Sequence, residues 1–207
     1  MADNQSTEFL VLRTTRVGDS KIIANGVTPS SGRMSFMVYG SGSGRRGGVE
    51  FGLFRLLQVT YLDNGRELKR CETVEVLADY GGVSRVYERY SAGCWLSRFG
   101  LANMLPGLGC PYLFQAMKIG FERLSSGDLL PEAIVTGVIL VYLREGGWLS
   151  DYEDSPETAR QIQALLEMAL GGEAPRLTDG NWRELHEWTR ALLRLNEECV
   201  IPDECGG

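Results

Sequence analysis

Residues 33–51, "RMSFMVYGSGSGRRGGVEF", contain an abrupt change of pattern. The first eight residues alternate between apolar and polar side chains, as a half-buried β-strand requires. Five glycines and two serines then surround a pair of arginines before the apolar character returns. The fold depends on whether this glycine-rich segment joins two strands of a sheet or holds a phosphate group at the start of a helix.

The segments on both sides favour the first interpretation. Five β-rich runs, bounded by turn-forming residues, lie within the first 80 residues: "EFLVLRTT" (8–15), "SKIIANGV" (20–27), "RMSFMVYG" (33–40), "FRLLQVTYL" (54–62) and "RELKRCETVEVL" (66–77). The "DNG" at 63–65 predicts a tight hairpin between the last two runs. Five short strands in about seventy residues predict a small, OB-like antiparallel β-barrel.

The periodicity changes to that of helices after residue 80. We expect helices over the segments 83–104, 111–125, 131–146, 156–170 and 180–197. The helix at 131–146 is apolar nearly all round, so the others should pack against it. Ser155 and Pro156 suit an N-cap followed by proline at the first helical position. The sequence therefore predicts an α+β protein, with a barrel domain at 1–80 and an all-α domain at 81–207.

Composition and charge narrow the class of protein. The 207 residues are 43% hydrophobic and 23% charged, which is ordinary globular usage. The polar start "MADNQSTE" does not resemble a secretory signal, and the apolar run "AIVTGVILVYL" is too short to span a bilayer, so we expect a cytoplasmic protein. Residues 1–100 carry 13 basic and 10 acidic side chains, whereas residues 101–207 carry 8 and 17. An electropositive half, suited to phosphates, is joined to an acidic half.

A dinucleotide site is the main alternative interpretation of the glycine-rich segment. "GSGRRG" at 42–47 matches G-x-G-x-x-G, and Asp63 follows at the spacing of a ribose-binding acid. That interpretation needs a helix directly after Gly47 and a series of alternating strands and helices. The sequence offers neither, so we expect the segment to be a strand connection.

As a connection between barrel strands, the segment points to nucleic acid. Small five-stranded barrels bind single strands by combining a positive groove with aromatic stacking. The candidate DNA-binding residues are Lys21, Arg33, Arg45, Arg46, Lys69 and Arg70, with Tyr39 as the stacking residue. Phe36 shares the face of Met34 and Val38 and is expected in the core.

The sequence predicts a binding protein rather than an enzyme. The chain has one histidine, His186, and no recognisable nucleophile motif accompanies it. Its five cysteines form no C-x-x-C pair, so we expect no zinc site and no cofactor.

The order of these motifs resembles the RecO family of recombination mediators. The similar segments are "FLVLRTTRVGDSKII", "TPSSGRMSFMVYG", the basic loop "GSGSGRRGG", "FGLFRLLQVTYL" and "CETVEVLADYGG", and the resemblance continues to about residue 154. The four-cysteine zinc element of many members is missing here. The loop is also less basic than is usual in the family.

The resemblance implies a function in DNA repair and recombination. A family member binds single- and double-stranded DNA, anneals complementary strands and acts with RecR and single-strand-binding protein, in association with the nucleoid. The helical half would dock the tail of single-strand-binding protein, for which Lys118 and Arg123 are the candidate contacts. A non-catalytic protein-interaction module without DNA binding remains the alternative.

Overall fold

The computed structural model describes residues 4–18, 21–39, 51–63, 65–149 and 155–203. The chain separates into two compact units, each described by itself below. One unit comprises Met1–Gly81 with Ser97–Pro111, and the other comprises Gly82–Leu96 with Tyr112–Gly207. The predicted division into domains 1–80 and 81–207 stays a prediction, and the segment 97–111 groups with the strands.

Five strands and five α-helices confirm the predicted α+β class. The strands are β1 (Asn4–Val17), β2 (Lys21–Thr28), β3 (Gly32–Tyr39), β4 (Arg55–Leu62) and β5 (Leu68–Asp79). Each coincides with one of the five predicted β-rich runs. Because residues 55–62 form a strand, the helix that a dinucleotide site needs after the glycine-rich segment is not formed there. The strand interpretation of this region is correct, although residues 40–50 themselves lie outside the described part.

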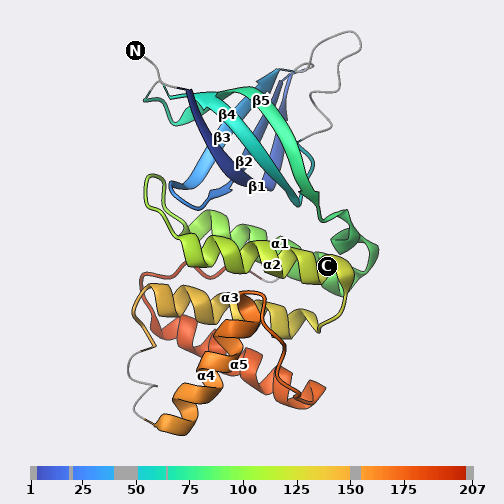
Figure 1. Ribbon diagram of the computed structural model, residues 1–207, viewed down its shortest axis with the longest axis vertical. Helices are drawn as coiled ribbons and strands as arrows, with labels where there is room; N and C mark the ends of the chain where they lie inside the picture. The colour runs from blue at the N-terminus through green and yellow to red at the C-terminus, as the bar shows by residue number, and fades with distance from the viewer. Residues whose placement is uncertain (1–3, 19–20, 40–50, 64, 150–154, 204–207) are drawn as a thin grey trace. The chain divides into compact units, whose positions relative to one another are not determined.

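The strands pair in a closed ring with the order β1-β2-β3-β5-β4 (Figure 1). Four of the five pairings are antiparallel, but β3 and β5 run parallel, with Ser35, Phe36 and Met37 opposite Leu68, Lys69 and Arg70. The prediction of a wholly antiparallel sheet is therefore wrong. The reason is topological: directions that alternate around a ring of five strands must repeat once, because five is odd.

Strand β1 closes the ring because it pairs with two neighbours in succession. Residues 4–10 pair with β4, and residues 10–17 pair with β2. Leu10 belongs to both ladders, and an irregularity between Val11 and Arg13 marks the change. The strand passes close to Gly26 of β2 at this point, where a Cβ atom would lie 2.1 Å from the Leu10 carbonyl oxygen. The absence of a side chain at residue 26 is therefore what allows the ring to close here.

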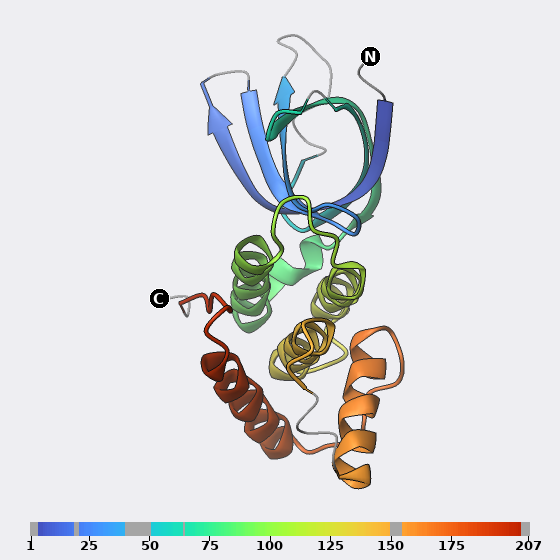
Figure 2. The same ribbon diagram turned by 90° about the vertical axis from the view of Figure 1, so that its left-hand side faces the viewer.

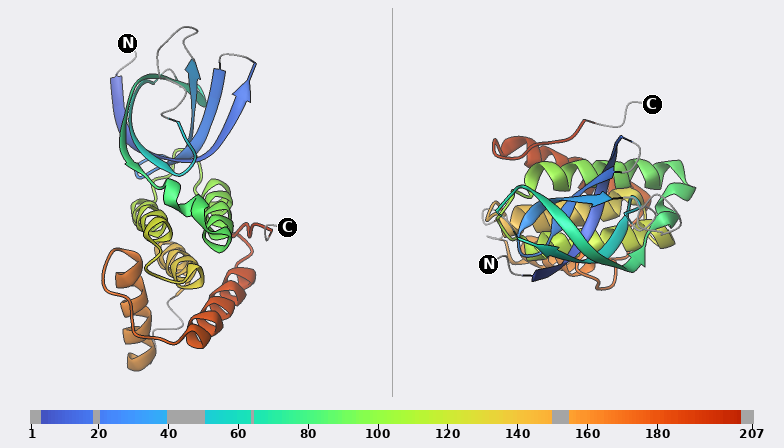
Figure 3. Two further views of the ribbon diagram at one scale, coloured as in Figure 1. Left: turned by 90° about the vertical axis from the view of Figure 1, so that its right-hand side faces the viewer. Right: turned by 90° about the horizontal axis from the view of Figure 1, so that it is seen from above.

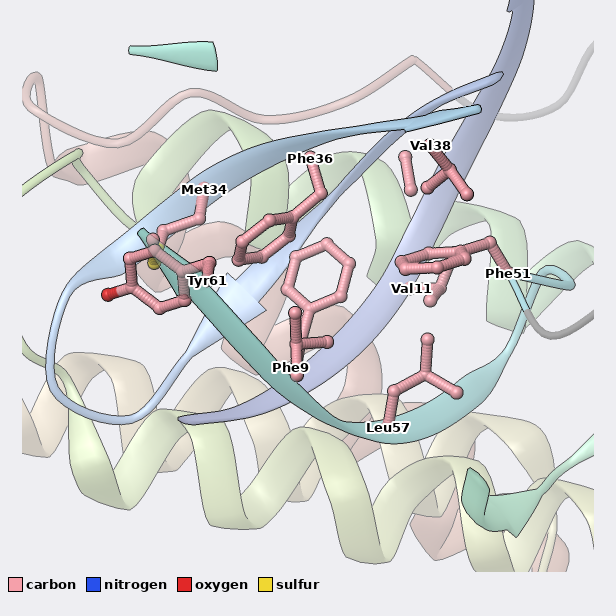
Figure 4. Close-up of a cluster of buried hydrophobic side chains, with 10 residues drawn as sticks. Phe9, Val11, Met34, Phe36, Val38, Phe51, Leu57 and Tyr61 are labelled. Carbon is pink, nitrogen blue, oxygen red and sulfur yellow. The ribbon is translucent and has the colours of Figure 1, made fainter. Parts of the chain in front are cut away.

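The interior of the ring is an aromatic and aliphatic core (Figure 4). Phe36 is fully buried and meets Phe9 edge to face, with 4.8 Å between ring centroids, and Tyr61 in a similar way at 5.3 Å. Met34 and Val38 are buried beside Phe36, which confirms the predicted alternation along β3. The residues between these three, Ser35 and Met37, consequently face outward.

The helices are α1 (Tyr87–Asn103), α2 (Pro111–Ser126), α3 (Pro131–Glu145), α4 (Pro156–Ala169) and α5 (Asp179–Leu195), after a short 3-10 helix η1 (Gly81–Arg85). All five predicted helices are present. Ser155 is the N-cap residue of α4 and Pro156 opens the helix, as expected, although the Ser155 side chain makes no capping hydrogen bond. The side chain of Thr178, which the sequence did not single out, caps α5 by accepting from the Asn181 N–H.

In the second unit α3 is the central helix, as its apolar sequence predicts. All residues from Ala133 to Leu143 are buried, and α4 and α5 lie on opposite sides of α3 (Figures 2 and 3). The Glu145 carboxylate at the end of α3 accepts hydrogen bonds from the backbone N–H groups of Tyr112 and Leu113 in the first turn of α2. No helix within the described residues is long and apolar enough to cross a membrane.

We predict that Gly26→Ala destabilises the barrel. The added methyl group would overlap the Leu10 carbonyl oxygen and lie 2.7 Å from the Phe9 ring, so β1 and β2 must separate. Overpacking of this kind costs about 1–3 kcal/mol. The midpoint of urea unfolding should fall accordingly. Gly180→Ala is the control, because a Cβ atom there has only the Thr178 hydroxyl oxygen, at 3.8 Å, within reach. Equal midpoints for the two variants would contradict the close approach.

Candidate nucleic-acid interface

Charge is distributed unevenly around the barrel. Residues 9–49 contain a single acidic residue, Asp19, and six basic ones: Arg13, Arg16, Lys21, Arg33, Arg45 and Arg46. Residues 50–79, which supply β4 and β5, contain six acidic residues and four basic ones. The side of the barrel formed by the second half of β1, by β2 and by β3 is therefore the electropositive side.

The strand register identifies which side chains point outward on this side. Phe36 points inward, so its neighbours Ser35 and Met37 point outward, together with their partners on β2, Asn25 and Ile23. Ser35 donates a hydrogen bond from Oγ to Asn25 Oδ1 at 2.9 Å, which confirms that the two share a face. We call the outward surface formed by Arg13, Thr15, Val17, Lys21, Ile23, Asn25, Ser35 and Met37 the basic face.

Two exposed arginines of β1 were not among the predicted site residues, and one of them, Arg13, belongs to the basic face. Arg13 lies opposite Asn25 on the basic face, and Arg16 lies near the end of the same strand; both are exposed. Within the described part of the chain neither has a recorded ion pair or hydrogen bond. Strict alternation from Phe9 and Val11 would have placed Arg13 inside, and the irregularity before it moves it outward. The near absence of acidic residues from 9 to 49 is the signal that would have found both.

Of the predicted DNA-binding residues, Lys21 and Arg70 join this surface. Lys21 is exposed at the start of β2. Arg70 of β5 is opposite Met37 across the parallel pairing, and its side chain is 68% exposed. It also forms an ion pair with Glu72, at 3.3 Å from Nε to Oε1. Exposed ion pairs are worth little, so Arg70 can exchange this partner for a phosphate at small cost.

Arg33 and Lys69 are instead held by other groups of the same unit. Arg33 donates from Nη1 to the Leu101 carbonyl oxygen at 2.9 Å. Lys69 is only 14% exposed and its Nζ lies 2.5 Å from Asp63 Oδ1. Both residues line a cleft of about 400 Å³ that also contains Asp63, Arg66 and Glu67. The two acids offset much of the positive charge of this cleft, which makes it a poorer polyanion site than the basic face.

The pKa of Asp63 is lowered by this arrangement. The hydrogen bond from Lys69 is the main cause, and a hydrogen bond from the Gly65 N–H adds to it. Burial, and secondarily the Asp63 charge, raise the pKa of Tyr61, whose hydroxyl donates to Gln5 Oε1 at 2.8 Å. The ionised form of Asp63 is thus the form that the folded turn between β4 and β5 stabilises.

The remaining barrel predictions lie outside the described residues. Arg45 and Arg46 belong to the segment 40–50. The backbone of Tyr39 pairs with Lys21 at the end of β3, but its side chain is not described. Their assignment to DNA binding stays a prediction from the sequence.

In the second unit the predicted partner contacts are engaged within the fold. Arg123 of α2 donates from Nη2 to the Gly172 carbonyl oxygen at 2.6 Å, and Lys118 is half-buried on the same helix. A separate groove of about 360 Å³ lies between α1, α3 and α5. Its walls include Trp95, the exposed Tyr87 and Arg190, whose guanidinium carbon lies 5.1 Å from the centre of a Trp95 ring.

The one histidine of the chain also lines this groove. His186 Nδ1 lies 3.4 Å from the Thr136 hydroxyl oxygen of α3, so the residue sits between α3 and α5. Glu88 and Glu132 contribute acidic side chains to the rim. Throughout the described residues, no group of three or more His, Cys, Asp or Glu side chains is placed to hold a metal ion.

Comparison with known proteins concerns the first unit. Residues 1–80 match the family model described as recombination protein O N terminal. No curated protein matches the chain. The matched residues contain all five strands and the whole of the basic face.

We predict that the Asp63–Lys69 pair makes stability depend on pH in the acid range. Because the folded state lowers the pKa of Asp63 below its ordinary 3.8, the pair contributes stability above that pH and loses it as the pH falls through the folded value. Asp63→Asn should melt at a lower temperature than the unmodified protein at pH about 6, and the difference should shrink as the pH falls below 3.8. A difference that stays constant over this range would contradict the assignment.

Proposed function

We propose that this protein is a member of the RecO family, because its residues 1–80 match the model of the N-terminal domain of recombination protein O, and that it binds single- and double-stranded DNA and anneals complementary strands. In this proposal it assists recombinase loading at gaps together with RecR and single-strand-binding protein. It does so as a binding protein without catalysis, in the cytoplasm and in association with the nucleoid.

The observation that carries the proposal is the basic face. Arg13 and Lys21 lie on it, Arg70 borders it, the exposed Arg16 lies close to it at the end of β1 but on the register of the inward-facing residues, and no acidic residue occurs among residues 21–39 or 9–18. Cations on such a surface neutralise phosphates and release their counterions, which is the main source of affinity for DNA without regard to sequence.

The strand order supports an OB-like assignment of the barrel. OB-folds are five-stranded Greek-key barrels whose second and third strands, with the loops after strands one and four, bind oligonucleotides. The order β1-β2-β3-β5-β4 returns the chain to β3 only after β4, as a Greek-key path requires. In this protein β2 and β3 form most of the basic face.

Annealing follows from charge neutralisation by the same surface. Two complementary strands repel each other through their phosphates, and this repulsion falls when Arg and Lys side chains replace the counterions. A strand held by its phosphates keeps its base edges available for pairing. The proposal therefore requires contacts to the backbone of DNA and no chemical step.

We predict that Arg13→Ala/Arg16→Ala weakens DNA binding and its dependence on salt. Each phosphate contact contributes about 0.7 to the slope of log affinity against log salt for a single strand, so the double variant should flatten the slope by about 1.4. Fluorescence anisotropy of a labelled oligonucleotide across a salt series measures it. Arg45→Ala/Arg46→Ala should flatten the slope by up to the same amount.

Arg176→Ala/Arg183→Ala is the matched control, because it removes two exposed arginines from the second unit. Its slope should equal that of the unmodified protein. If the Arg13→Ala/Arg16→Ala variant kept an unchanged slope, the basic face would not be the DNA surface. Absence of binding even at low salt would favour the protein-interaction module.

For single-strand-binding protein, we propose that its apolar and acidic tail docks on the second unit. The groove beside Trp95 offers an apolar wall and the Arg190 guanidinium, whereas Arg123 already donates to Gly172. The same groove also supports the alternative function, a protein-interaction module, because a peptide could bind there without any nucleic acid.

Substitutions distinguish the two candidate docking sites for the tail, which are the groove beside Trp95 and helix α2. A labelled peptide of the tail should bind Arg190→Ala at least about tenfold more weakly than the unmodified protein, as expected when one partner of a charged contact is removed. Lys118→Ala should bind normally if the groove is the site. If only Lys118→Ala bound the peptide more weakly, the docking site would lie on α2. If both variants bound the peptide normally, neither location would be the site.

A further inference from the structure

Among the described residues of the barrel, every aromatic side chain is buried. Between residues 4 and 81, six aromatic side chains are described, and all six are buried: Phe9, Phe36, Phe51, Phe54, Tyr61 and Tyr80. Within the described residues, the outer surface of the barrel therefore offers no ring on which a DNA base can stack. Single-strand-binding barrels ordinarily combine such rings with positive charge.

The centre of the basic face is aliphatic instead. Across the strands, Thr15, Ile23 and Met37 lie side by side in that order, followed by Arg70 of β5. Ile23 and Met37 are half-exposed, and they occupy the middle of this row. They stand where a stacking residue would have the most effect.

Cations surround this aliphatic centre. Arg13 belongs to the neighbouring row on one side, with Asn25 and Ser35, and Lys21 belongs to the row on the other side. Successive rows are two residues apart along a strand, which is roughly 7 Å. A strand crossing the face can thus place phosphates against the cations and sugars against Ile23 and Met37.

We propose that Ile23 and Met37 determine the mode of binding, so that this barrel holds DNA by its backbone and leaves the bases unstacked. The inference rests on the proposed function and specifies it. Stacking of one base on an aromatic side chain strengthens binding by about 5-fold to 150-fold. A base held in that way must be released before it can pair. An aliphatic centre removes this barrier, which suits annealing better than storage of single strands.

The test compares two oligonucleotides of equal length, oligo-dT and an abasic deoxyribose-phosphate analogue. Because the analogue keeps every phosphate, the unmodified protein should bind the two with affinities within about twofold of each other. Ile23→Trp and Met37→Trp should prefer oligo-dT by about fivefold or more, with quenching of the new tryptophan fluorescence. They should also anneal complementary strands more slowly than the unmodified protein.

Thr73→Trp is the matched control, because Thr73 is exposed on the outer side of β5, opposite Thr60 and away from the basic face. It should show no base preference and anneal normally. Ile23→Leu should do the same, since it adds no ring.

Failure of this inference differs from failure of the proposed function. If the unmodified protein preferred oligo-dT by tenfold or more, the inference would be overturned while DNA binding stood, and loss of that preference in Tyr39→Ala would assign the stacking to Tyr39. Folded tryptophan variants that gained no base preference would also overturn it. Absence of binding to both oligonucleotides at low salt would instead refute the proposed function.

Discussion

The shared strand β1 is the constraint on which the barrel depends. Its first half pairs with β4 and its second half with β2, so removal of either ladder would open the ring. The change of partner occurs where Leu10 passes over Gly26, a position that tolerates no Cβ atom. The irregularity in β1 between Val11 and Arg13, directly after this point, turns the Arg13 side chain from the interior to the surface. Ring closure and the exposure of the Arg13 cation are thus both set within the same few residues of β1.

The polarity of the barrel follows from the way the sequence is divided among the strands. The chain segment that supplies β2, β3 and the second half of β1 has almost no acidic residues, whereas β4 and β5 carry acids beside their bases. In the second group the cations are largely paired, as Lys69 with Asp63 and Arg55 with Asp79 at 2.7 Å. Among the described residues, the side formed by β2, β3 and the second half of β1 therefore carries an excess of positive charge. A polyanion is directed to that side by charge alone.

Periodicity alone predicted the strands, the helices and the buried α3, because hydrophobic spacing reports directly which face of an element is covered. It could not predict the parallel pairing of β3 with β5, although an odd closed ring requires one. It could not reveal the ion pair between Lys69 and Asp63, since that pair depends on the turn between β4 and β5. Arg13 was missed because a single extra residue in β1 reverses its side. The sequence does not show which groups a side chain contacts where strand register or turn geometry, rather than composition, decides those contacts.

The central claim is that DNA lies across β1, β2 and β3 and is held there by charge. Amide hydrogen exchange with and without a saturating oligo-dT measures the contact surface on the whole chain. The account predicts slower exchange in the second half of β1, in β2 and in β3, with β4 and α3 to α5 unchanged. Protection confined to the helices, or to β4 and the second half of β5, would contradict it.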